Sequence, residues 1–364
     1  MASPTTHFIV VHIFTILVAT SNAWRPKFSS ILVFGDSTVD PGNNNFLETL
    51  FKGNHSPYGR DFPGHRPTGR FSNGKLVTDF IASLLQIKEF VPPYLDPNLS
   101  DLELLTGVSF ASGGSGIDDL TTISSGVVPV SKQIEYFREY VERIKRIVGK
   151  EESQKVLGRA LVIISAGTND FSFNFYDVPT RKYEFDISEY QDFLQNRFQI
   201  FIKELYSLGC RKVAVVGLPP IGCIPLQITT KLKNLKDRKC VEQENIDSEL
   251  YNKKLERLLL HAQAMLPGSR VVYVDVYNPL INLINQPEKY GFEVTKRGCC
   301  GSGIFEAGPL CNELTPACEE ASKYVFWDSV HPSEAAYKYI AKYVEEEVLP
   351  KFVNNNSDSS ELYL

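Results

Sequence analysis

Short apolar runs alternate with segments of helical periodicity along this chain. Five runs rich in β-branched residues lie at 30–35, 107–112, 160–167, 212–219 and 270–276. All except 107–112 are continuous rather than alternating, which is typical of strands buried on both faces of a sheet. Helical patterns lie at 72–86, 131–149, 190–209, 241–265 and 333–348. This order predicts an α/β fold, a three-layer α/β/α sandwich with a mainly parallel sheet of about five strands.

Capping residues mark the ends of three of these helices. Ser72 or Asn73 is expected to begin the first, while Gly149 and Gly209 are expected to end the second and third. No internal repeat or linker divides the 364 residues, which are 43% hydrophobic. We therefore expect a single domain over residues 24–352, followed by a flexible tail over 353–364.

The first 23 residues have the pattern of a secretory signal peptide. They contain no Lys, Arg, Asp or Glu, and an apolar core from Phe8 to Ala19 precedes the small residues Ser21-Asn22-Ala23. This core is shorter than the roughly 20 residues of a membrane-spanning helix, so a membrane anchor is the weaker alternative. We expect cleavage after residue 23, no integral membrane span and a secreted protein.

The cysteines and the charge agree with export. Cys210 borders an apolar run and is expected to stay a buried free thiol, whereas the other six are expected to form disulfides of open pairing. Those six are Cys223, Cys240, Cys299, Cys300, Cys311 and Cys318.

Asn-x-Ser sequons at Asn54, Asn98 and Asn355 are candidate glycosylation sites. A net charge of −5 without a basic block argues against a nucleic-acid partner.

Small and polar residues follow the apolar runs. Gly35-Asp36-Ser37 comes after the first run, Ser112-Gly113-Gly114-Ser115-Gly116 after the second and Gly167-Thr168-Asn169-Asp170 after the third. The carboxyl ends of parallel strands meet at one edge of a sheet, where ligands bind. Ser37 is the candidate nucleophile there, provided that a base accepts the proton of its hydroxyl.

His331 is the candidate base among the six histidines. His7 and His12 lie in the predicted signal peptide, His55 and His65 in a loop rich in Gly and Pro, and His261 in a predicted helix. Asp328 precedes His331 by three residues, close enough to accept the imidazole Nδ1 proton and to orient the ring. No Cys-x-x-Cys pair or suitably spaced histidine indicates a metal site.

Donors for a developing oxyanion are also available. The candidates are the backbone N–H groups of Ser37 and of Gly113 or Gly114, and the side-chain amide of Asn169. The tandem glycines leave open which of them donates. Asp36 is expected to cap the backbone rather than to act in catalysis. The Gly-x-Ser-x-Gly elbow of α/β-hydrolases is absent, because residue 39 is Val.

The segments that carry these candidate residues resemble the sequence blocks of plant-type GDSL esterase/lipases of the SGNH hydrolase superfamily. The resemblance extends from about Phe28 to Pro350. The similar blocks are FGDSTVDPGNNN, GRFSNGK, GVSFASGGSGI, SAGTND, GLPPIGCIP, GCCGSGIFEAGPLC and VFWDSVHPSE. Thr38 and Ser109 depart from the pattern, which has Leu and often Asn at these positions. Neither change removes a catalytic group.

The resemblance implies a secreted carboxylic-ester hydrolase of the cell wall or apoplast that needs no metal or organic cofactor. Ser37 is then the nucleophile, His331 the base, Asp328 its orienting group, and Asn169 with Gly113 or Gly114 the oxyanion donors. The substrate is a small-molecule or polymer-borne ester, and activity is expected to fall when the imidazole is protonated.

Two other functions and one structural question stay open. An acyltransferase would use the same acyl-enzyme, and a non-catalytic defence or binding protein could share the fold. The stretches 171–190 and 279–293 are rich in aromatic residues near the expected cleft. Phe171, Phe173, Phe175 and Tyr176 either line a pocket for an acyl or aryl group or only cover the edge of the sheet.

Overall fold

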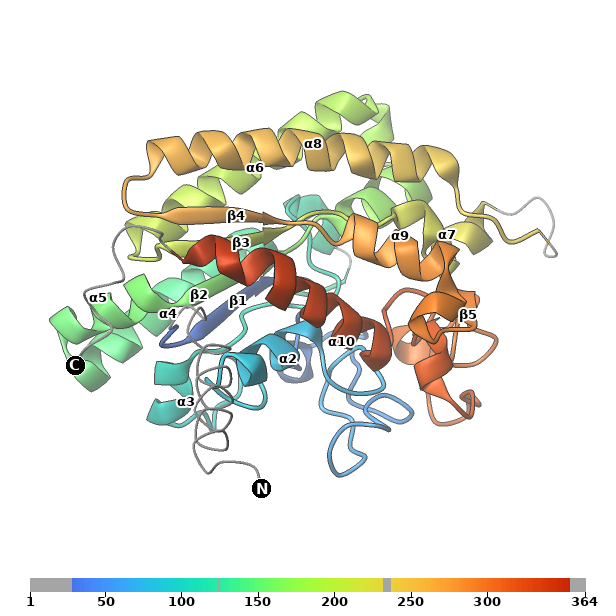
Figure 1. Cartoon of the computed structure of the whole chain (residues 1–364), viewed down its shortest axis with the longest axis horizontal. Helices are drawn as coiled ribbons and strands as arrows, with labels where there is room; N and C mark the ends of the chain where they lie inside the picture. Colours follow the sequence, from blue (N-terminus) through green and yellow to red (C-terminus); the bar gives the residue numbers. More distant parts are fainter. Residues whose placement is uncertain (1–27, 124, 232–236, 354–364) are drawn as a thin grey trace, which may run out of the picture.

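A four-stranded parallel sheet forms the centre of the protein (Figure 1). The computed structural model describes residues 28–123, 125–231 and 237–353. The strands, in spatial order, are β1 (Ile31–Gly35), β2 (Leu161–Ser165), β3 (Lys212–Val216) and β4 (Arg270–Val274). The predicted signal peptide, nearly all of the predicted tail and Asn355 lie outside the described residues.

Alternate strand residues face two separate apolar layers, since successive side chains of a strand point to opposite faces. Leu32 and Phe34 of β1 face the layer formed with the long helices. Those helices are α4 (Val130–Val148), α6 (Ile187–Ser207) and α8 (Glu242–Met265), with α5 (Lys150–Arg159) beside α4. Ile31 and Val33 face the second layer.

The second layer is closed by the first and last helices of the domain. They are α2 (Val77–Leu84), α10 (Glu334–Tyr343), the π-helical η9 (Val344–Val348) and the 3₁₀ turn η10 (Leu349–Phe352). In Figure 1, α6 and α8 lie along one side of the sheet, and α10 and α2 lie along the other. The three-layer α/β/α sandwich is therefore confirmed.

Smaller elements gather beyond the carboxyl ends of the strands, where Figure 1 places α7, α9 and β5. Their bounds are α7 (Pro225–Thr230), α9 (Tyr277–Asn285), β5 (Val294–Gly298) and its parallel partner β6 (Tyr324–Phe326), while α3 (Asp101–Thr106) precedes the segment beside β1. Of these, α7, α9, β5 and β6 lie at the edge of the sheet where the sequence predicts the site.

The predicted strand at 107–112 is an irregular edge segment rather than a fifth strand. It runs parallel to β1, where Val33 N–H donates to Val108 O (3.1 Å) and Phe110 N–H to Val33 O (2.7 Å). On its outer side, Asn43 Nδ2 donates to the carbonyl oxygens of Ser109 and Ala111, both at 2.8 Å. Within this segment, the backbone of residues 92–94 bonds only to Ser109, where Tyr94 N–H donates to Ser109 O (2.9 Å) and Ser109 N–H to Pro92 O (2.9 Å), so isolated bridges form instead of a strand.

The predicted cap of α2 is wrong by about four residues. Ser72 Oγ accepts the N–H of Gly74, while Asn73 Oδ1 accepts the N–H of Glu334 at the start of α10. The helix begins at Val77 instead, where Asp79 Oδ2 accepts the N–H of Leu76 (2.9 Å). The predicted caps Gly149 and Gly209 lie at the ends of α4 and α6, as expected.

All six predicted cysteines form disulfides. The pairs are Cys223–Cys240, Cys299–Cys318 and Cys300–Cys311, and Cys210 is a buried free thiol. The sequon residues Asn54 and Asn98 are exposed. Among the described residues, no helix combines the length and apolar character that a membrane span requires.

Candidate active site

Ser37 lies directly after β1 on a turn that only glycine permits at Gly35. There φ is +137°, and a Cβ on Gly35 would lie 1.8 Å from the carbonyl oxygen of Ser165 in β2. The next N–H, from Asp36, donates to the same carbonyl (3.0 Å). Close packing of two strand ends thus fixes the backbone beside Ser37, whose side chain is almost fully buried.

The structure brings together Ser37, His331 and Asp328. His331 Nε2 lies 2.8 Å from Ser37 Oγ, although 294 residues separate them in sequence. His331 Nδ1 lies 2.7 Å from Asp328 Oδ2. Because a carboxylate only accepts, Nδ1 carries the hydrogen and Nε2 is left to accept the serine hydroxyl. The predicted trio therefore has the geometry of a serine nucleophile with its base.

Asp328 is fully buried, and hydrogen bonds satisfy both of its oxygens. Oδ1 accepts the N–H groups of Val330 (2.8 Å) and His331 (2.7 Å). Oδ2 accepts the hydroxyl of Tyr58 (2.6 Å) besides the His331 ring. Tyr58 in turn accepts the N–H of Gly308 (2.8 Å), and burial, followed by the charge of Asp328, raises its pKa well above the usual range.

Sequence reasoning missed both Tyr58 and Phe71. The Phe71 ring stacks on the His331 imidazole with centroids 4.9 Å apart and planes at 28°. Both aromatics lie in the Gly- and Pro-rich loops before α2, where nothing in the local pattern assigns them a partner. The histidines of that region bond to nearby carbonyls instead, His55 to Lys52 O and His65 to Arg60 O.

The structure distinguishes the two candidate glycines. The N–H of Gly113 donates to Asp40 Oδ2 (2.9 Å), a carboxylate whose pKa burial raises to about 6. The N–H of Gly114 has no hydrogen-bond partner among the described residues, and its φ is +86°. Asn169 Nδ2 donates to Ser115 O (2.8 Å), which leaves its second hydrogen free to act as a donor.

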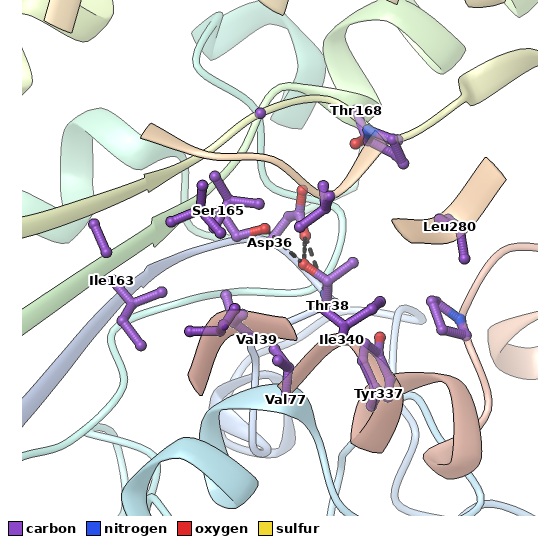
Figure 2. A pocket seen from close by; sticks show the side chains of 18 of the residues that line it. Asp36, Thr38, Val39, Val77, Ile163, Ser165, Thr168, Leu280, Tyr337 and Ile340 are labelled. Carbon is purple, nitrogen blue, oxygen red and sulfur yellow. Dashed lines mark hydrogen bonds between the residues drawn. The ribbon is translucent and has the colours of Figure 1, made fainter. Parts of the chain in front are cut away.

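Asp36 caps the turn, as expected. Its Oδ1 accepts the N–H (3.0 Å) and the hydroxyl (2.8 Å) of Thr38, and Figure 2 shows these two bonds. The Thr38 hydroxyl also lies 3.0 Å from Ser165 Oγ. Burial raises the pKa of Asp36, while the bonds from Thr38 and the charge of His331 oppose that effect. Thr38, a departure from the family pattern, thus ties the nucleophile turn to β2.

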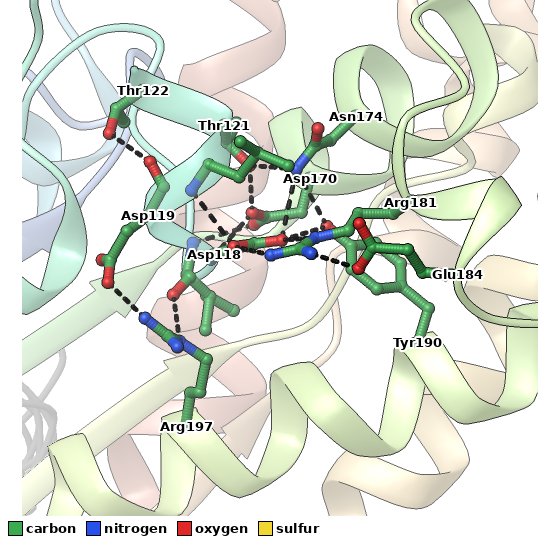
Figure 3. Close-up of polar contacts among 12 residues, drawn as sticks. Asp118, Asp119, Thr121, Thr122, Asp170, Asn174, Arg181, Glu184, Tyr190 and Arg197 are labelled. Carbon is green, nitrogen blue, oxygen red and sulfur yellow. Dashed lines mark hydrogen bonds and ion pairs between the residues drawn. The ribbon is translucent and has the colours of Figure 1, made fainter.

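A buried carboxylate holds the segment that carries Asn169 (Figure 3). Asp170 Oδ2 accepts the N–H of Ile117 (2.9 Å), and Oδ1 accepts the N–H of Asp118 (3.0 Å) and the hydroxyl of Thr121 (2.6 Å). Burial raises the pKa of Asp170 to about 7. The loop after the glycine pair and the segment after Asn169 are therefore joined next to both candidate donors.

Asp118 connects this cluster to residues 174–190, which follow Asp170 in the chain. Arg181 binds it through two nitrogens, Nε to Oδ2 (2.6 Å) and Nη2 to Oδ1 (3.0 Å), as Figure 3 shows. Asn174 Nδ2 (3.2 Å) and the hydroxyl of Tyr190 (3.3 Å) also donate to Oδ2. The π-helical segment η3 (Asp170–Asp177) is thereby fixed between the site and α6.

Phe171, Phe175 and Tyr176 pack in or against the layer that covers the sheet, and none of them lines the cavity next to the site. Phe171 and Phe175 are buried in the layer shared with α6 and α8. The ring of Phe171 lies 5.3 Å from that of Tyr251, and the ring of Phe175 lies 5.4 Å from that of Tyr190. From the other aromatic-rich stretch, Leu280 does border a cavity next to the site (Figure 2).

A parallel α/β/α sheet with a serine, histidine and aspartate in hydrogen-bond contact at its carboxyl edge defines an α/β serine hydrolase. The chain belongs to the GDSL-like lipase/acylhydrolase family, whose sequence profile matches residues 31–344. It is 52% identical to the GDSL esterase/lipase At2g30310 of Arabidopsis thaliana over 343 residues, which are 94% of this chain and 95% of that protein.

Two further relatives from Arabidopsis thaliana agree. The GDSL esterase/lipase At2g30220 is 52% identical over 91% of this chain and 92% of its own length. The GDSL esterase/lipase At2g24560 is 50% identical over 94% of this chain and 95% of its own length. The family makes the protein a carboxylic-ester hydrolase, as the sequence blocks predict.

Replacing Tyr58 with Phe tests its role as a positioning residue. Tyr58→Phe removes one bond to Asp328 and leaves the Gly308 N–H without its acceptor. We expect kcat on p-nitrophenyl acetate to fall about 10- to 100-fold, since a hydrogen bond to a charged group contributes roughly 1.5–3 kcal/mol. KM should stay unchanged. The exposed Tyr183→Phe serves as the control, and equal kcat values in the two variants would contradict the role.

The buried Asp170 predicts a pH-dependent stability. Its folded pKa of about 7 exceeds the ordinary 3.8, so between these values the folded state binds more protons than the unfolded state. The contribution of this group to stability therefore falls as the pH rises from about 4 to about 7, by up to roughly 1.4 kcal/mol per pH unit.

Urea unfolding of the wild type and of Asp170→Asn at several pH values measures this dependence. The stability of the wild type relative to the variant should decrease across that window and level off above it. Parallel stability curves from pH 4 to pH 8 would contradict the raised pKa.

Proposed function

We propose that Ser37 attacks the carbonyl carbon of a carboxylic ester to form an acyl-enzyme, with His331 as general base. The observation that carries this proposal is the 2.8 Å contact between His331 Nε2 and Ser37 Oγ, with the imidazole held by Asp328. Both ring nitrogens of His331 thus have the partners that proton transfer from a serine requires: a carboxylate at Nδ1 and the serine hydroxyl at Nε2.

The reaction has two halves. Ser37 Oγ bonds to the carbonyl carbon while its proton moves to His331 Nε2, and the alcohol then departs with that proton. Water attacks the acyl-enzyme while His331 accepts one of its protons, and the acid and the free serine are released. Asp328 stays ionised throughout and stabilises the imidazolium.

Three donors are proposed for the oxyanion: the N–H of Ser37, the N–H of Gly114 and the free hydrogen of the Asn169 amide. Gly114 is preferred to Gly113 because the N–H of Gly113 already donates to Asp40. The positions of the last two donors depend on the cluster around Asp170, which gives that buried carboxylate a supporting role in catalysis.

The protein is further proposed to act outside the cell, as a single domain after cleavage of residues 1–23. Three disulfides are typical of proteins that fold in an oxidising compartment. The exposed Asn54 and Asn98 are proposed glycosylation sites, together with Asn355.

Replacement of the nucleophile gives the direct test. Ser37→Ala should lower kcat/KM on p-nitrophenyl butyrate by at least about 10⁴-fold, because no other group can form the acyl-enzyme. The matched control is Ser207→Ala, an exposed serine at the end of α6. Activity retained in a folded Ser37→Ala protein would refute the mechanism, and products measured with an added alcohol would separate hydrolysis from acyl transfer.

Replacement of Asn169 tests the oxyanion donor. Asn169→Ala should lower kcat by about 10²–10³-fold with little change in KM, since the donor acts mainly on charge that develops in the transition state. The control is Asn278→Ala, whose exposed side chain donates to Asp275 Oδ2. A rise in KM at constant kcat would instead indicate a role in ground-state binding.

A further inference from the structure

A cavity of about 110 Å³ lies between the sheet and the helices of the second layer (Figure 2). Its floor consists of side chains that share one face of the sheet, namely Leu161, Ile163, Ser165, Ala214, Val216 and Val274. Its roof comes from α2, α10, η9 and η10, through residues that include Val77, Ile340 and Leu349. The cavity thus lies inside the apolar layer but adjoins the site.

The two faces of the sheet are filled differently. On the face toward α4 and α6, the Phe34 ring contacts Phe110, Phe137 and Phe201 at centroid distances of 4.9–5.4 Å. On the cavity side, the central position of β3 is Ala214, and most of its neighbours are aliphatic. Protein interiors are normally close-packed, and a hollow apolar layer lowers stability. A cavity retained beside a nucleophile therefore indicates a binding space.

The polarity of the lining changes along the cavity. Asp36, Ser37 and Asn169 line the end at the carboxyl edge of the strands. Phe352 marks the opposite end, since Arg270, the first residue of β4, donates from Nε to the carbonyl of Lys351 (2.7 Å). The apolar part runs from Ser165 to Leu161 along β2, four residues or about 13 Å. That distance matches an extended alkyl chain of roughly ten carbons.

The roof departs from regular helix over this space. After Tyr343, α10 continues as the π-helix η9, and the first and last residues of η9, Val344 and Val348, both line the cavity. Single π-helical turns are rare and occur frequently at functional sites. Tyr337 of α10 also lines the cavity, and its buried hydroxyl has no hydrogen-bond partner among the described residues.

We propose that this cavity binds the acyl chain of the substrate, so that the protein prefers esters of unbranched acyl groups of medium length. The inference rests on the proposed function. The acyl group stays bonded to Ser37 until water arrives, whereas the alcohol must leave first, so an enclosed apolar space suits the acyl side of the ester. The chain extends from Ser37 under α10 toward Phe352, which limits its length.

Narrowing the cavity at Ala214 tests the proposal. Ala214 is paired with Ile163, midway along the strands, and both side chains line the floor. Ala214→Val and Ala214→Leu place added carbons in the empty space. The kcat/KM of each protein is measured on p-nitrophenyl esters from acetyl to palmitoyl. Ala335→Leu, a half-buried alanine of α10 outside the cavity lining, is the control.

The wild type should prefer octanoyl or decanoyl esters. Ala214→Leu should lower the ratio of decanoyl to acetyl activity at least tenfold, with Ala214→Val intermediate. Acetyl activity within twofold of the wild type would show that each variant is folded and that Ser37 is intact. An unchanged ratio in such a variant would overturn the proposal and make the cavity a mere void in the core.

A binding measurement separates this inference from the proposed mechanism. Decanoic acid is titrated into Ser37→Ala protein and into the double variant Ser37→Ala/Ala214→Leu. Binding that the second change weakens at least tenfold supports the cavity even if no ester is hydrolysed. Equal binding by both proteins, or none by the first, would overturn it.

Discussion

The burial of the Asp328 carboxylate is the constraint on which the site depends. A buried charge is tolerated only when hydrogen bonds replace its hydration, and Asp328 accepts four. Two come from its own turn, one from the His331 ring and one from Tyr58, 270 residues away in sequence. Satisfying this one group therefore joins the N-terminal loops to the C-terminal turn and fixes the orientation of the His331 ring.

Other buried aspartates join segments in the same way. Asp40 accepts the N–H groups of Gly42, Asn43 and Gly113, and so links the turn after Ser37 to the glycine pair. Asp170 links that same region to the segment of Asn169. Each segment of the site is thus attached to its neighbour by a carboxylate that would be costly to leave unpaired, which makes the site rigid although loops carry most of it.

The parts of the site that the sequence predicted are those encoded locally. Ser37 follows a continuous apolar strand, and Asp328 and His331 share one turn, so short patterns were sufficient to single out three residues that the structure brings into contact. Tyr58 could not be found, because its contact with Asp328 depends on how two distant loops pack. The preference for Gly114 over Gly113 as the oxyanion donor depends on which of the two N–H groups donates to Asp40, and this contact is not visible in the sequence. The start of α2 was misplaced because the side-chain oxygen of Asn73 accepts the N–H of Glu334 at the start of α10. This tertiary contact overrides the local capping signal. The cavity depends on side-chain volumes summed over elements from both the sheet and the helical layer, which no local pattern contains.

Two of the disulfides bear on when the site can form. Cys299 and Cys300 donate their N–H groups to the carbonyls of Phe326 and Trp327, just before Asp328. Glu306 O accepts the N–H of Ser329, just after it. The segment between residues 299 and 318 therefore holds both sides of the Asp328 turn, whereas the sheet that carries Ser37 contains no disulfide. Reduction would remove the covalent links beside the turn of Asp328 and His331, but would leave the backbone hydrogen bonds of the sheet. Formation of these disulfides is therefore a condition for a fixed position of the His331 turn, but not for the turn that carries Ser37.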